Sequence, residues 1–290
     1  MDAKHLPLLA GIFSTRVVSE LLKYGNCGYL SRTMASSGFL EEFPAVHTLG
    51  DLYTRIYDVL RRGYRNEYVY KNAIAEKILL GRHSLNTACM VSEFRVHNCK
   101  ADVVIFNGTS NVYEIKTEYD SLDRLEHQLE AYLKVFDKVN VVTAQKHTKK
   151  VLAQAPESVG VFELTSRYTL SPQRAATSNK GNVEPAIIFN SFRKPEYTQA
   201  VLDNFGYVPD VPNTLIFSAC KDLFQTLEPA VAHDTMVRAM RTYRTIKAPQ
   251  RNILVKLPRS LSALTIKANF SLAQLDVLSS LLNERVHSIV

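Results

Sequence analysis

Residues 100–116 read KADVVIFNGTSNVYEIK, and this stretch decides the expected fold. It holds two short runs rich in Val, Ile, Tyr and Phe, which are typical of β-strands. Asn107–Gly108 stands between the runs and is among the best short-range hairpin signals. We therefore expect strands at 101–106 and 112–116, and a further strand at 90–96 before them.

Helical patterns flank these strands. Apolar residues recur at helical spacing in 66–80 and again in 122–137, and residues 139–143 read as one more strand. The expected order is helix, three strands, helix, strand, which is a mixed α/β (α+β) core. We place this core at 66–170, after an N-terminal helical region at 1–65 and before a mainly helical, basic C-terminal region at 185–290. Residues 145–150 are expected to form a basic loop, and 171–184 a flexible linker.

The strand period predicts which side chains meet. Residues two apart share one face of a strand, so Glu114 and Lys116 point the same way, while Asp102 lies on the neighbouring strand of the hairpin. Two carboxylates and an ammonium on one sheet surface are costly to bury unless they have partners. A divalent cation resolves this cost, and Mg²⁺ suits carboxylate and carbonyl oxygens, with Mn²⁺ as a second choice. We expect Asp102, Glu114 and the Ile115 carbonyl to hold the metal. Lys116 would orient a metal-activated water for attack on a phosphodiester.

Three further residues join this candidate site. Glu76 lies on the apolar face of the first helix, where a carboxylate is unexpected, and we count it as a metal ligand. Gln128 and Tyr132 are four residues apart on the second helix and so share a face, from which they would orient Lys116 or contact a phosphate. Each residue alone has a plainer explanation, such as an exposed ion pair or a helix flank. Their joint occurrence, in the right elements and order, favours a site.

The pattern resembles the PD-(D/E)XK nuclease superfamily, which has a restriction-endonuclease-like α-β-β-β-α-β core. The residues that carry the resemblance are Lys100–Ile105, Tyr113–Lys116 and Asp123–Tyr132. The Gln-x-x-x-Tyr spacing is most similar to the branch with RecB-type and lambda-exonuclease-type domains, and the stretch also resembles an uncharacterised bacterial family often carried on mobile elements. The resemblance covers about residues 66–143, extends more weakly to about 202, and has Ala101 in place of the namesake proline. It implies that Asp102, Glu114 and Glu76 are metal-binding acids and that Lys116 is the catalytic lysine.

Composition excludes several other classes. The four cysteines show no CxxC spacing, so neither a disulfide framework nor a zinc site is expected. No apolar stretch is long enough for a membrane span, and we expect a cytoplasmic protein without a membrane partner. The sequence contains no phosphate-binding glycine loop and no motif of a zinc protease or serine hydrolase.

Basic residues point to a nucleic-acid partner. The net charge is +7, and residues 235–290 hold nine Lys or Arg against two acids, which equals the whole excess. Such a segment suits phosphate backbones, although a solvated helix surface gives the same asymmetry. The expected nucleic-acid contacts are Lys146, Lys149, Lys150, Arg238, Arg241 and Arg244.

The sequence thus predicts a Mg²⁺-dependent nuclease acting on DNA, in phage defence, repair or mobile-element biology. The alternative is a nuclease-fold protein that binds nucleic acid or a protein partner without cutting. The intact Glu114 and Lys116 pair argues against that alternative, because a chain freed from catalysis need not keep it. RNA as substrate and a homodimer both remain compatible with the sequence.

Overall fold

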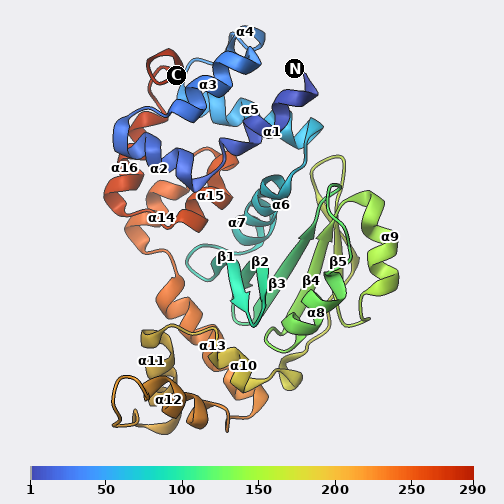
Figure 1. Ribbon diagram of the computed structural model, residues 1–290, viewed down its shortest axis with the longest axis vertical. Coiled ribbons are helices and arrows are strands. Elements are labelled where there is room, and N and C mark those ends of the chain that lie inside the picture. The colour runs from blue at the N-terminus through green and yellow to red at the C-terminus, as the bar shows by residue number, and fades with distance from the viewer. Residues whose placement is uncertain (1) are drawn as a thin grey trace. The chain divides into compact units, whose positions relative to one another are not determined.

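The computed structural model describes residues 2–290, which form a mixed α/β fold with helices at both ends of the chain (Figure 1). The chain divides into two compact units. Unit 1 consists of residues 1–78, 166–168 and 246–290, and unit 2 consists of 79–165 and 169–245. These boundaries differ from the three regions expected from the sequence, because the chain returns to unit 1 after completing unit 2.

Unit 1 is all helical. Its elements are η1 (Ala3–His5), α1 (Leu6–Gly11), α2 (Thr15–Tyr24), α3 (Gly28–Ser37), α4 (Phe39–Glu42), α5 (Leu49–Gly63), α6 (Glu67–Ile74), the π-helical segment η2 (Ala75–Leu79), α14 (Ala248–Leu254), η4 (Arg259–Leu261), α15 (Ser262–Ala268), α16 (Leu272–Leu281) and η5 (Val286–Ser288). The two ends of the chain are joined here by backbone hydrogen bonds, one of them from Gly50 to the Leu282 carbonyl at 2.8 Å. A Cβ at position 50 would lie 2.9 Å from that oxygen, so the close approach requires glycine.

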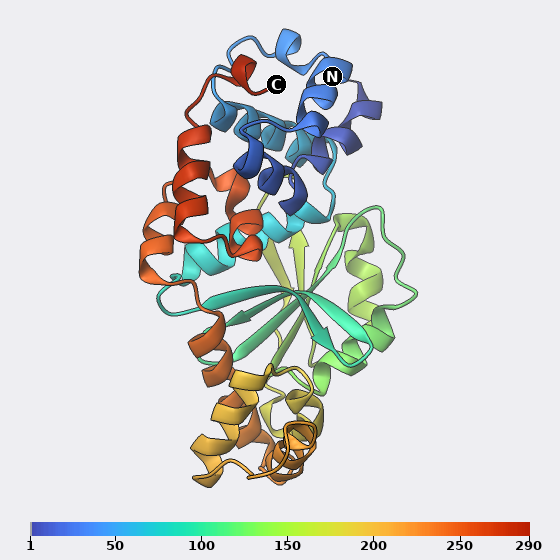
Figure 2. The ribbon, with the colours of Figure 1, turned by 60° about the vertical axis from the view of Figure 1, so that its left-hand side comes forward.

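Unit 2 is built on a sheet of six strands in sequence order (Figure 2). The strands are β1 (Cys89–Val96), β2 (Cys99–Phe106), β3 (Ser110–Lys116), β4 (Lys138–Thr143), β5 (Gly160–Leu164) and β6 (Leu170–Arg174). Pairs β1–β2, β2–β3 and β5–β6 are antiparallel, whereas β3–β4 and β4–β5 are parallel. The expected hairpin is present, and Gly108 adopts a φ of 102° in its turn, a conformation that favours glycine.

Parallel neighbours need a crossover connection, and two helices supply it. Helix α8 (Leu125–Leu133) joins β3 to β4, and α9 (Gln145–Gln154) joins β4 to β5. Leu129 of α8 and Val151 of α9 share one hydrophobic cluster with Val141 of β4. The remaining helices of unit 2 are α7 (Leu80–Arg82), η3 (Lys180–Asn182), α10 (Pro185–Phe189), α11 (Lys194–Phe205), α12 (Ile216–Phe224) and α13 (Pro229–Arg244).

Two expectations about local structure were wrong, and a third needs an adjustment. Residues 145–150 begin helix α9 instead of forming a loop, because Thr148 and Val151 give this lysine-rich segment a buried side. Part of the expected linker is strand β6, and the rest is fixed by Asp137, which accepts hydrogen bonds from the backbone of Asn179 and Lys180. The helix expected at 66–80 is present, but residues 75–79 are π-helical and the helix continues to Arg82, past Gly81.

No helix within residues 2–290 combines the length and the apolar character needed to cross a bilayer.

Candidate active site

Asp102 and Glu114 lie on adjoining antiparallel strands. Val103 of β2 pairs with Tyr113 of β3, and continuing this ladder by one residue places Asp102 opposite Glu114 on the same face. The Asp102 carboxylate is half-buried and accepts a hydrogen bond from the Ile115 backbone N–H at 2.8 Å. The two acids expected from the strand pattern are therefore neighbours.

Glu114 and Lys116 form an ion pair beneath the surface. Glu114 Oε1 lies 3.2 Å from Lys116 Nζ, and the two residues are only 2% and 5% exposed. Burial raises the pKa of Glu114 above its ordinary value, and the Lys116 ammonium opposes that shift. A buried pair of this kind is stable only if its remaining donors and acceptors are also satisfied.

Gln128 and Tyr132 of α8 supply those partners. The Lys116 ammonium donates to Gln128 Oε1 at 2.8 Å, and the Tyr132 hydroxyl donates to Glu114 Oε2 at 2.8 Å. Burial, together with the neighbouring Glu114 charge, raises the pKa of Tyr132, so the phenol keeps the proton that it donates. Four side chains from one strand and one helix thus form a continuous hydrogen-bonded network.

The end of β3 is fixed by a turn that the sequence analysis did not identify. The Asp120 carboxylate accepts from both the backbone N–H and the hydroxyl of Thr117, each at 2.7 Å. This turn directly follows Lys116 and holds the chain where the strand ends. A Thr-x-x-Asp spacing after the Glu-x-Lys pair was the available signal.

Glu76 lies in unit 1, whereas Asp102, Glu114, Lys116, Gln128 and Tyr132 lie in unit 2. Within its own unit, Glu76 belongs to η2 and accepts a hydrogen bond from Asn72 Nδ2 at 2.7 Å. Burial raises its pKa. Its role as a metal ligand stays a prediction.

The expected nucleic-acid contacts have different surroundings. Lys149 and Lys150 are exposed on α9, and the Lys146 ammonium donates to the Glu118 carbonyl. Arg238 and Arg241 are exposed on α13. Arg244 at the end of α13 instead makes two hydrogen bonds of 2.7 Å to Glu196, and Glu196 is 1% exposed.

The donor set can be compared with the expected metal. Among residues 2–290, no three His, Cys, Asp or Glu side chains gather as a metal-binding group. Asp102 and Glu114 supply two carboxylates, and the Ile115 carbonyl is the third oxygen that the sequence suggested. Oxygen donors of this kind fit Mg²⁺, which keeps several waters in its coordination shell.

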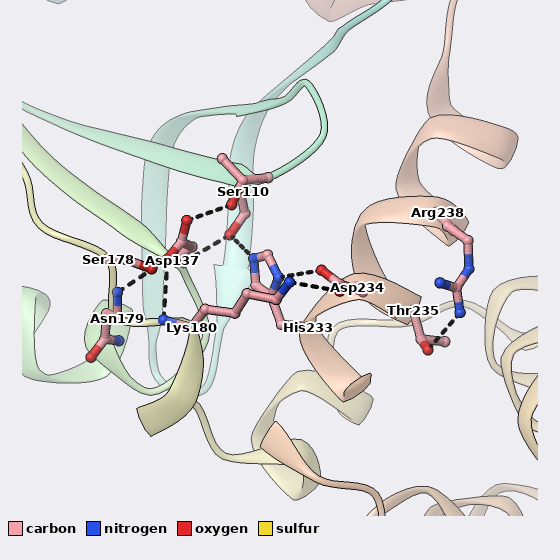
Figure 3. Close-up of polar contacts among 10 residues, drawn as sticks. Ser110, Asp137, Ser178, Asn179, Lys180, His233, Asp234, Thr235 and Arg238 are labelled. Atoms are coloured by element: carbon pink, nitrogen blue, oxygen red, sulfur yellow. Dashed lines mark hydrogen bonds and ion pairs between the residues drawn. The ribbon is translucent and has the colours of Figure 1, made fainter. Parts of the chain in front are cut away.

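A second polar network in unit 2 was not expected from the sequence (Figure 3). Ser110 Oγ lies 2.9 Å from His233 Nε2, and His233 Nδ1 lies 3.2 Å from Asp234 Oδ1. The order of groups is that of a catalytic serine triad. However, Ser110 and His233 are both fully buried, and Ser110 Oγ also accepts from the Asp137 backbone N–H at 3.0 Å. This network therefore joins the sheet to α13 and does not face a substrate.

The buried His233 makes the stability of unit 2 depend on pH. Burial lowers the pKa of His233 below its usual 6.5, despite the nearby Asp137 and Asp234 carboxylates, while the Lys180 ammonium lowers it further. Below about pH 6.5 the unfolded chain binds a proton that the folded chain does not, so the unfolding free energy decreases as the pH is lowered. The contribution of neutral His233 to stability is fully present above that pH. We expect urea unfolding of wild type to show this loss of stability between pH 7.5 and 5, because histidine in the unfolded chain has a pKa of about 6.5.

His233→Gln should lower the stability at neutral pH but flatten its pH dependence, and His127→Gln, which changes an exposed histidine of α8, should leave the dependence intact. An unchanged slope in His233→Gln would contradict this assignment. Asp137 acts in the same direction at lower pH. Burial alone would raise its pKa, but hydrogen bonds from Ser178, Thr109 and Asn179 lower it.

Residues 61–253 match the family described as "Bacteriophage P4 protein cII". The chain belongs to this family. Protein cII of Enterobacteria phage P4 is 39% identical to the chain over 101 residues, which are 34% of this chain and 38% of the phage protein. The chain therefore aligns with well under half of that cII relative.

A solved structure, the SPO1766 protein of unknown function from Silicibacter pomeroyi, aligns with 47% of this cII-family chain and 88% of its own length. The identity is 16% and the TM-score is 0.32, a similarity too weak to support an argument.

Proposed function

We propose that the chain is a metal-dependent nuclease that hydrolyses phosphodiester bonds in DNA. One observation carries the proposal: Glu114, Lys116, Gln128 and Tyr132, which the sequence singled out from separate elements, form one hydrogen-bonded network. Asp102 lies opposite Glu114 on the next strand. The resemblance to PD-(D/E)XK nucleases predicts this combination of acid pair, lysine and Gln-x-x-x-Tyr helix.

Asp102, Glu114 and the Ile115 carbonyl would hold Mg²⁺ or Mn²⁺. When bound there, the metal would lower the pKa of a coordinated water and offset charge on the phosphate. Tyr132 holds one oxygen of Glu114 and fixes the direction of that carboxylate.

Lys116 has three N–H donors, and Glu114 and Gln128 engage two of them. We assign the third to the attacking water or to a phosphate oxygen, whose negative charge grows in the transition state. Gln128 would then keep the Lys116 ammonium in place when Glu114 turns from its ion pair with Lys116 toward the metal. Exposed Lys149, Lys150, Arg238 and Arg241 would contact the backbone of the substrate.

The second candidate function is a nuclease-fold protein that binds nucleic acid or a protein partner without cutting. The low exposure of Glu114 and Lys116 favours it, because a closed ion pair needs no substrate to be stable. Membership of a family named after a phage protein is compatible with either function.

Incubating the purified chain with duplex DNA, single-stranded DNA and RNA would decide between these functions. We expect cleavage of DNA with Mg²⁺ or Mn²⁺, none with EDTA, and recovery when excess Mg²⁺ is added back. Cutting of RNA alone would change the substrate class. Binding without cutting would support the second function, and cutting that persists in EDTA would refute the metal-dependent mechanism.

A further inference from the structure

The excess positive charge of the chain lies entirely in unit 1. Unit 1 has 17 Lys or Arg against 10 Asp or Glu, whereas unit 2 has 18 of each. Unit 1 therefore carries the whole net charge of +7, and unit 2, which holds the candidate active site, is neutral. The basic C-terminal segment is divided between the two units, because Arg238, Arg241 and Arg244 belong to unit 2.

Within unit 1, two cations lie over the ring of one tyrosine. The guanidinium carbon of Arg61 and the Nζ of Lys77 each lie 5.5 Å from the centre of the Tyr168 ring. The Tyr168 ring is itself held, because it is 6% exposed and its hydroxyl is hydrogen-bonded to that of Tyr57. A third cation, Arg259, belongs to the same neighbourhood, because Asn72 Nδ2 donates both to the Arg259 carbonyl at 3.0 Å and to Glu76 at 2.7 Å. We call Arg61, Lys77 and Arg259, with Tyr168, the Tyr168 cluster. Cations held on an aromatic face lose less conformational freedom when they bind a ligand.

The Tyr168 cluster has more positive than negative charge. Arg61 pairs with Asp58 at 3.0 Å, and Glu76 is close enough for Lys77, Arg259 and Arg61 to oppose the rise in its pKa caused by burial. Throughout residues 2–290, neither Lys77 nor Arg259 forms an ion pair within 4.0 Å, and both are exposed. The three cations are thus opposed by only two carboxylates, those of Asp58 and Glu76. The remaining charge of +1 could be neutralised by one more anionic group.

Two further features near the cluster are also unusual. Lys77 lies in the π-helical segment η2, and short π-helical segments occur frequently at functional sites. Ser260, next to Arg259, is 5% exposed, and its hydroxyl has no hydrogen-bond partner among the described residues. A buried hydroxyl without a partner needs an explanation, and a bound anion is one that would satisfy it.

We propose that the Tyr168 cluster binds a backbone phosphate of nucleic acid, so that unit 1 supplies affinity and unit 2 supplies the chemistry. The identity of the polymer rests on the proposed nuclease function. An anionic membrane is the less favoured ligand, because membrane-binding surfaces combine cations with exposed apolar side chains, and the tyrosines here are buried. Phosphate contacts fix position without reading sequence, which suits a general backbone site.

Binding of the full chain to a labelled DNA duplex in EDTA, measured by fluorescence anisotropy over a range of salt concentrations, tests this proposal. We expect Lys77→Ala/Arg259→Ala to bind about tenfold more weakly and to lower the salt slope by about two, since each backbone contact contributes about one. The charge-preserving variant Lys77→Arg/Arg259→Lys should keep most of the affinity. Lys23→Ala is the matched control, because Lys23 is exposed in unit 1 and also lies over a tyrosine ring, 4.7 Å from that of Tyr24.

The proposal is overturned if the double variant keeps the affinity and slope of wild type, or if Lys23→Ala loses as much. It is also overturned if the chain binds anionic vesicles but not DNA. Equal thermal melts of wild type and the double variant would exclude unfolding as the cause of weaker binding, and the charge-preserving variant serves as the folded comparison if they differ. DNA that is bound through the cluster but never cut would remove the nuclease proposal and leave this one standing.

Discussion

Lys116→Met is expected to lower the rate of DNA cleavage by about 100-fold to 1,000-fold, the range seen when one group that stabilises transition-state charge is removed. The side chain of methionine fills similar space but brings no donor to the phosphate. The same change should also destabilise unit 2, because Glu114 would remain buried without its cation. Removing one partner of a buried pair costs roughly 3–5 kcal/mol. Cleavage under single-turnover conditions and urea unfolding measure the two effects.

The double variant Glu114→Gln/Lys116→Met separates catalysis from stability. It removes both charges, so much of the lost stability should return, while Tyr132 can still donate to the amide oxygen at position 114. Cleavage should stay absent, since the double variant lacks both the metal-binding acid and the lysine. A double variant that regains both stability and cleavage would show that the pair is structural and that the site lies elsewhere.

Arg244→Ala is expected to destabilise unit 2 by roughly 3–5 kcal/mol, because it leaves the Glu196 carboxylate buried without a cation. The guanidinium also donates to the Ser191 carbonyl and lies 5.2 Å from the centre of the Phe94 ring, so packing is lost as well. Urea unfolding would measure this change.

Arg241→Ala is the control in the same helix, and the change in unfolding free energy should be within about 0.5 kcal/mol because Arg241 is exposed. If Arg244→Ala were as stable as wild type but bound DNA more weakly, Arg244 would be a nucleic-acid contact, as predicted from the sequence. This comparison therefore decides which of the two roles the arginine has.

The sheet and its hairpin were predictable because local rules determine them. Alternation of side chains located the first four strands, and Asn107–Gly108 located the turn. The contacts of Lys116 with Gln128 followed from two periods, two residues in a strand and four in a helix. The helical state of 145–150 was missed, since a short basic segment gives a weak signal until its apolar side has a sheet to pack on. Strand β5 was also missed.

Long-range pairing is what the sequence did not reveal. Ser110 and His233 are 123 residues apart, and Arg244 and Glu196 are 48 apart, so no local pattern connects them. The depth of the Glu114–Lys116 pair was hidden for the same reason, because burial depends on the helix that later covers the strand. The positive charge was assigned to one C-terminal segment, but the two units divide that segment between them.

The return of the chain to unit 1 affects the order of folding during synthesis. Unit 2 is nearly continuous in the chain, so its sheet has all its strands once residue 174 has left the ribosome. Unit 1 has to wait, because Leu49 and Gly50 bond to carbonyls of Glu284 and Leu282, which are translated much later. Contacts between such distant positions form slowly. Residues 2–78 therefore lack these partners while the intervening residues are translated, and chaperones can bind them during that time.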